Sequence, residues 1–149
     1  MTSYERTGWR DQEISARHRA WGFNCPAVDL DFLMVEYNLG YPVAVVEYKS
    51  HHARLSNLKH PTYRALGELY DRDGKQLPLF IVRYWPTTWA FRVLALNDSA
   101  QQWLQPDTWV DMSEREFVTG LYRLRQLTIE HQVIARLYEE RPPSEAVAS

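Results

Sequence analysis

The sequence predicts one α/β domain, because helix-like segments alternate with short β-rich runs along the chain. Residues 28–37, 42–50, 77–85 and 89–97 have the length and the β-branched and aromatic content of strands. Helical patterns come before, between and after these runs. With 149 residues and 45% hydrophobic content, the chain is long enough for one domain with a substantial core.

Two short helices are predicted in the first half of the chain. The first covers residues 7–21, where Glu13 and Arg17 have the four-residue spacing of a helical ion pair. The second runs from Pro61, a residue favoured in the first helical turn, to about Asp71. The two helices therefore flank the first pair of strands along the chain.

The C-terminal third is predicted to be helical. A short capped helix follows the last strand, and Ser113 and Glu116 have the spacing of a capping box before a long amphipathic helix. The tail at 142–149 is expected to fray. The single domain would then have its core at about 9–97 and a helical extension at about 98–141.

A hairpin loop is predicted between the first two strand-like runs. The residues Asn38, Leu39 and Gly40 match a three-residue loop, which commonly ends in a left-handed residue and favours glycine there. This loop would place Tyr37 opposite Tyr41. Because loop geometry fixes strand register, it also determines which charged residues lie side by side.

In that register, charged side chains gather on one face of the hairpin. Asp31 lies opposite Glu47 and Asp29 lies opposite Lys49, and residues two apart on a strand share a face. A slip by two residues is the alternative, in which Asp29 takes the place of Asp31. A slip by one residue would send the two halves of the cluster to opposite faces.

Such an arrangement needs a compensating positive charge. Two carboxylates directly opposite each other repel, and apolar neighbours make their ionisation still more costly. Lys49 supplies one positive charge and a divalent ion supplies two. Oxygen ligands without histidine or thiolate suit Mg²⁺ or Mn²⁺, so the cluster predicts a metal site with an adjacent lysine. An exposed ladder of ion pairs on a half-solvated sheet is the alternative.

These residues resemble the PD-(D/E)XK nuclease superfamily. The resemblance consists of Asp31 on one strand and Glu47-Tyr48-Lys49 on the next, with a helix before them and a helix and a strand after them. It covers roughly residues 9–84, although the motif itself is short. It implies a restriction-endonuclease-like mixed β-sheet flanked by helices, here followed by the long C-terminal helix.

The resemblance also assigns roles to the residues of the cluster. It implies that Asp31 and Glu47 bind a divalent ion, with the Tyr48 carbonyl as a further ligand, and that Lys49 positions or polarises the attacking water. An acid from the first helix often joins such sites, and Glu13 is the candidate.

The chain departs from the superfamily pattern in several places. No proline precedes the aspartate, and the helix after Lys49 lacks the Gln-x-x-x-Tyr signature of RecB-like exonucleases. Only residues 21–25 are available for the strand expected before that of Asp31. Glu5 is a second, weaker candidate for the acid of the first helix. The resemblance therefore reaches the superfamily and no branch within it.

The segment after Lys49 is a cationic island that could contact nucleic acid. Between Tyr48 and Gly67 the chain has no acidic residue and contains the candidate phosphate contacts His51, His52, Arg54, Lys59 and Arg64. Such contacts give affinity without reading sequence. A solvated helix face is the alternative explanation. The net charge of −2 argues against a basic coat over the whole protein.

The expected function is that of a Mg²⁺-dependent nuclease that hydrolyses phosphodiester bonds, with DNA as the expected substrate and Mn²⁺ as a possible substitute. The alternative is a non-catalytic nucleic-acid-binding or regulatory protein that retains the fold. Trp85, Trp89, Trp103 and Trp109 could stack on bases, although tryptophans next to strands more often fill a core.

The surroundings of the protein are also predicted. The sequence has no membrane-length apolar run, and its single cysteine, Cys25, fits a reducing, cytoplasmic location. No membrane partner is expected. A homodimer is possible, because cutting both strands of a duplex would be easier for two active sites.

Overall fold

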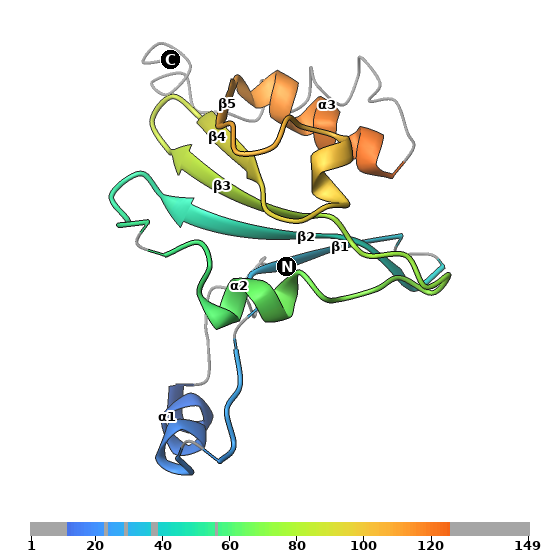
Figure 1. Ribbon diagram of the computed structural model, residues 1–149. Helices are drawn as coiled ribbons and strands as arrows, with labels where there is room; N and C mark the ends of the chain where they lie inside the picture. The colour runs from blue at the N-terminus through green and yellow to red at the C-terminus, as the bar shows by residue number, and fades with distance from the viewer. Residues whose placement is uncertain (1–11, 23, 29, 37–38, 56, 126–149) are drawn as a thin grey trace, which may run out of the picture.

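A five-stranded mixed β-sheet forms the centre of the protein (Figure 1). The computed structural model describes residues 12–22, 24–28, 30–36, 39–55 and 57–125. The strands lie in chain order across the sheet: β1 (Phe32–Glu36), β2 (Tyr41–Ser50), β3 (Leu79–Trp85), β4 (Ala90–Ala95) and β5 (Val110–Met112). β2 and β3 run parallel, and every other neighbouring pair is antiparallel.

Helices cover the two faces of this sheet. The helical elements are α1 (Gln12–Ala20), α2 (Pro61–Leu66), the short 3₁₀ helix η2 (Ala100–Gln102) and α3 (Glu114–Leu124). α2 and α3 lie on opposite sides of the sheet, while α1 stands apart from it (Figure 1). The predicted α/β class, a mixed sheet flanked by helices, is therefore confirmed.

The main core lies between the sheet and α3. Strand residues at alternating positions point to this side and pack with Phe117 of α3 and Ala100 of η2. The buried members are Val46, Phe80, Val82, Phe91, Val93, Ala95, Ala100 and Phe117. Phe91 and Phe117 stack with ring centroids 4.3 Å apart. This cluster joins three central strands to the C-terminal helix.

The opposite face has a smaller core under α2. Its buried members are Val45, Leu66, Leu77 and Leu79. α2 has only six residues and begins with Pro61 at its first turn, as the sequence predicts. It ends at Leu66 rather than near Asp71. The carbonyl of Gly67 instead accepts hydrogen bonds from the side chains of two later segments.

The hairpin loop is one residue longer than predicted. Glu36, not Tyr37, lies opposite Tyr41, and the register shifts between Met34 and Val35. Gly40 has a φ of +69°, the left-handed conformation that the sequence predicts. The pairs next to the loop therefore differ from the prediction by one residue. From Met34 back to Phe32, on the other side of the shift, the pairing matches the prediction.

The C-terminal part contains a strand that the sequence analysis missed. β5 lies within the segment expected to hold only helices, and its three residues are too few for a clear alternating pattern. The capping box of α3 is confirmed. Ser113 N donates to the Glu116 carboxylate at 2.9 Å, and Glu116 N donates to Ser113 Oγ at 3.1 Å. The predicted helix beyond residue 125 and the tail at 142–149 lie outside the described residues.

The remaining predictions concern the N-terminal segment and the membrane. Residues 21, 22, 24 and 25 form a turn and a bend, so they do not supply the extra strand that the superfamily pattern would place there. Within the described ranges, no helix is long and apolar enough to cross a membrane.

Candidate functional site

Asp31 and Glu47 meet where β1 begins to pair with β2. The pairing of Phe32 with Val46 agrees with the predicted register and places Asp31, one residue earlier, opposite Glu47. The backbone N–H of Asp31 donates to Glu47 Oε1 at 3.0 Å, and the backbone N–H of Tyr48 donates to Asp31 Oδ2 at 3.1 Å. These two hydrogen bonds link each carboxylate to the other residue's strand.

Glu47 is the one polar or charged residue that is buried in the described part of the chain, with 4% of its surface exposed. Burial raises the pKa of its carboxyl group, and the nearby charge of Asp31 raises it further. The hydrogen bond from the Asp31 backbone and the charge of Lys49 act in the opposite direction. The protein therefore holds this carboxylate at an electrostatic cost.

Tyr48 contributes its backbone to the site, and its side chain lies on the other face. The ring makes edge contacts with Phe32 and Phe117 at centroid distances of 5.0 and 6.2 Å. Burial raises the pKa of its phenol to about 12, so the group stays neutral. In a strand, the N–H and C=O of one residue point to the same side. The Tyr48 carbonyl therefore points to the same side of β2 as the Tyr48 N–H, which contacts Asp31.

Lys49 is half-buried and lies on the same face as Glu47, because it follows Glu47 by two residues in β2. Its positive charge opposes the rise in the Glu47 pKa. The structure thus brings Asp31, Glu47 and Lys49 together on the α2 side of the sheet.

The oxygen atoms at this place fit a hard divalent ion. Two carboxylates and one carbonyl are available, and Mg²⁺ is commonly held by one or two carboxylates while it retains several waters. In the residues that the structure describes, no group of three histidine, cysteine, aspartate or glutamate side chains is placed to hold a metal. The site therefore lacks the four-ligand cage of a structural zinc site.

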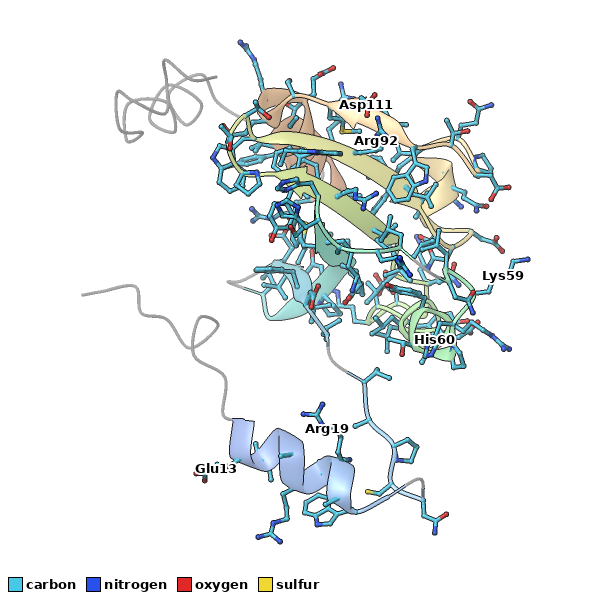
Figure 2. All side chains as sticks on the ribbon, turned by 90° about the vertical axis from the view of Figure 1, so that its left-hand side faces the viewer. Glu13, Arg19, Lys59, His60, Arg92 and Asp111 are labelled. Carbon is cyan, nitrogen blue, oxygen red and sulfur yellow. The ribbon has the colours of Figure 1, made fainter. Side chains whose placement is uncertain are left out.

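Glu13 is not brought to this pair. It lies on α1, which both views show apart from the sheet (Figures 1 and 2). Ile14 of this helix and Trp21, which follows it, are each 53% exposed. Asp29 and Glu5, the other acids considered from the sequence, lie outside the described residues.

The basic residues of the cationic island lie in two separate places. His51 and His52 directly follow β2, with ring centroids 3.8 Å apart, at the end of the strand that carries Lys49. Lys59 and Arg64 lie at α2, and the labelled Lys59 points away from the molecule (Figure 2). Arg54 is exposed in the loop between these two groups.

Two arginines on the same face escaped the sequence analysis. Arg83 of β3 lies directly beside Lys49, and Arg92 of β4 lies directly beside Arg83. The sequence signal is a single arginine inside each of two apolar strands. Their position beside Lys49 depends on the parallel pairing of β2 with β3, which no local loop specifies.

A mainly apolar cavity lies away from the carboxylate pair. It has a volume of about 420 Å³ between α3 and the sheet, and Val82, Trp103 and Leu121 are among its lining residues. Because it opens on the other face of the sheet from Glu47 and is mainly apolar, it does not belong to the carboxylate site. Trp89 packs beside Tyr84 and Phe91 on this same face, in the core role expected for it.

Comparisons of the chain with protein-family models, with curated proteins and with solved structures found no match. The fold and the site define the chain as a mixed α/β protein with an acidic pair and a lysine on one face of its sheet. The resemblance to PD-(D/E)XK nucleases depends on those residues and on the order of the elements.

Proposed function

We propose that the protein is a Mg²⁺-dependent nuclease that hydrolyses phosphodiester bonds, with DNA as its substrate and Mn²⁺ as a substitute ion. The observation that carries this proposal is the hydrogen-bonded contact between Asp31 and Glu47 beside Lys49. A buried carboxylate next to a second carboxylate is destabilising on its own. A doubly charged ion held by both would offset this cost.

Each residue of the site would have its own role in hydrolysis. The carboxylates of Asp31 and Glu47 and the carbonyl of Tyr48 would hold the ion, which when bound supplies a positive charge near the phosphate and lowers the pKa of a coordinated water. The ammonium group of Lys49 would orient the attacking water. The attacking water would lose a proton to solvent as its oxygen forms a bond to phosphorus. The bond from phosphorus to the leaving sugar oxygen would break, and that oxygen would take a proton from solvent.

The order of the elements supports the same reaction class. α1, β1, β2, α2 and β3 follow one another, with Asp31 directly before β1, Glu47 in β2 and Lys49 two residues after Glu47. A mixed sheet with helices on both faces is the scaffold that the superfamily resemblance implies. His51 and His52 then stand at the end of β2, close to where a phosphate would approach.

A cleavage assay tests the proposal. Supercoiled plasmid and single-stranded DNA are incubated with the protein in Mg²⁺, Mn²⁺ or a chelator. We expect cleavage by the wild type only with metal, no metal-dependent cleavage by Asp31→Asn or Glu47→Gln, and a loss of about 10²- to 10⁴-fold for Lys49→Ala.

Matched controls keep this assay specific. Asp98→Asn and Lys75→Ala change the same kinds of charge at exposed positions away from the site and should cut like the wild type. Cleavage by Asp31→Asn at the wild-type rate would contradict the proposal. Wild-type protein that binds DNA but never cuts it, with either metal, would identify the non-catalytic alternative.

A further inference from the structure

A row of basic side chains crosses the sheet beside the acidic pair. Lys49 of β2 is the direct neighbour of Arg83 in β3, and Arg83 is the direct neighbour of Arg92 in β4. Asp111 of β5 follows as the neighbour of Arg92. Directly paired residues share a face, so the row lies on the Glu47 side of the sheet. At about 4.8 Å between strands, its three cations span about 10 Å of backbone.

The row places like charges side by side, which destabilises a sheet unless an anion offsets them. Asp111 offsets one of them, with Oδ1 at 2.7 Å from Arg92 Nε. Within the described part of the chain, neither Lys49 nor Arg83 makes an ion pair. Lys49 also lies close enough to Glu47 for its charge to oppose the rise in the Glu47 pKa, so Arg83 is the one member of the row that no described carboxylate neutralises.

Arg83 is held in place by the loop that follows β2. One terminal nitrogen of its guanidinium donates to the Ala53 carbonyl. Its Nε is buried and has no hydrogen-bond partner among the described residues. A carbonyl does not neutralise a cation, so this contact fixes the Arg83 side chain between Lys49 and Arg92 without pairing it with an anion.

The far end of the row is open to solvent. The side chains of Arg92 and Asp111 are 46% and 75% exposed, and Figure 2 shows the two together at the β4–β5 side of the sheet. The Arg92 guanidinium carbon lies 5.9 Å from the centre of the Trp85 ring. An exposed ion pair contributes little to stability, so a phosphate can displace Asp111 from Arg92.

We infer that Lys49, Arg83 and Arg92 form a phosphate-binding row that holds a nucleic-acid backbone beside the Asp31–Glu47 pair. Arginine's planar guanidinium suits phosphate oxygens, and the row leads from the acidic pair across the strands toward β5. Asp111 competes with the backbone for Arg92. The choice of nucleic acid as the ligand rests on the proposed nuclease function, while the row itself rests on the strand register.

Binding without cleavage tests the inference. Fluorescence anisotropy follows fluorescein-labelled single-stranded DNA, duplex DNA and RNA of the same sequence, in chelator and over a series of salt concentrations. We expect Arg92→Gln to weaken binding and to reduce the salt slope, log K against log salt, by about 0.7–0.9 in magnitude. Asp111→Asn should strengthen binding several-fold, and this gain should disappear in the Arg92→Gln background.

Two further variants separate a direct contact from a change in net charge or folding. Arg115→Gln removes an exposed arginine from α3, on the other side of the sheet, and should leave the salt slope unchanged. Arg92→Lys keeps the charge and should retain most of the slope. Thermal unfolding followed by circular dichroism confirms that each variant is folded.

The outcomes distinguish this inference from the nuclease proposal. If the wild type cleaves DNA but Arg92→Gln and Arg115→Gln bind alike, the row is not the backbone contact and the inference fails alone. If binding depends on Arg92 while the wild type never cleaves, the nuclease proposal fails and the row stands. If no labelled nucleic acid binds, both fail.

Discussion

The two faces of the sheet differ in the polarity of their side chains. On the α3 face, Val46, Phe80 and Val82 continue a buried apolar surface from one strand to the next. On the α2 face, β2 passes from buried Val45 to Glu47 and then to Lys49 within five residues. The same sheet therefore supplies an apolar core on one side and a charged surface on the other.

The lengths of the covering helices explain this difference. α3 has eleven residues and joins a large apolar cluster, whereas α2 has six residues and covers only the end of the sheet near Leu79. Charged side chains can remain on the α2 side because the far end of that face is not covered by α2. Most of the free energy of folding should therefore come from the α3 face, and the chemistry from the other.

The largest expected effect comes from removing one apolar side chain from each face and comparing the losses in the free energy of unfolding. Phe117→Ala deletes a ring that stacks on Phe91, and we expect a loss of about 3–5 kcal/mol in the free energy of unfolding. Leu66→Ala, the corresponding change under α2, should cost about 2 kcal/mol, near the lower limit for such changes, because its cluster is smaller. Urea unfolding measures both values. An equal or larger loss for Leu66→Ala would show that the α2 face contributes as much stability.

A second variant, Glu47→Gln, should make the protein more stable while it removes the proposed metal-dependent activity. Glu47→Gln keeps the oxygen that accepts the Asp31 N–H but removes a buried charge beside a second carboxylate. We expect the Tm at neutral pH to rise by roughly 2–4 °C, the shift that about 1 kcal/mol produces in a domain of this size. Mg²⁺ should raise the Tm of the wild type and leave that of Glu47→Gln unchanged.

The pH dependence of this effect has a defined sign. Because burial raises the pKa of Glu47 in the folded state, ionised Glu47 destabilises the fold above that pKa. As the pH falls below the ordinary value of 4.5, Glu47 is protonated in both states and the advantage of the glutamine should vanish. Thermal unfolding of both proteins across this range checks the prediction. A lower Tm for Glu47→Gln at neutral pH would mean that the charge is already compensated within the protein.

The sequence could predict the acidic pair because a hairpin is local. The loop residues favour one register of β1 on β2. The pairing next to the loop differs from the prediction by one residue, but the shift between Met34 and Val35 restores the predicted register on the side of Asp31. The capping box of α3 was equally local. The confirmed parts of the fold are thus those encoded within short segments.

The parts that escaped depend on contacts between distant segments. Arg83 joins Lys49 through parallel pairing across the α2 crossover, and no short pattern encodes that register. Glu13 had suitable chemistry, but nothing in the pattern of α1 specifies where that helix lies relative to the sheet. β5 is defined by its pairing with β4 and has only three residues. The sequence therefore predicted contacts within short segments, and it did not predict how distant segments pack together.

The smallest expected effect concerns the ion pair that joins the end of β1 to the end of α3. Arg125 donates to both carboxylate oxygens of Glu36, at 2.8 and 3.0 Å, and this hydrogen bonding lowers the pKa of Glu36. A lowered pKa stabilises the folded state above the unfolded pKa, and that contribution is lost as the pH falls through the folded pKa. Glu36→Gln should therefore lower the Tm slightly at neutral pH and leave it unchanged in acid.

A double-mutant cycle in thermal unfolding isolates this pair. Arg125→Gln should lower the Tm in the wild type but have little further effect in the Glu36→Gln background. The control is Arg123→Gln, which changes an exposed arginine in the last turn of α3. It should change the Tm equally in both backgrounds. Equal losses from Arg125→Gln in the two backgrounds would mean that the pair does not couple β1 to α3. The acidic strand of the proposed site would then be held by the sheet alone, and the two faces would be energetically independent.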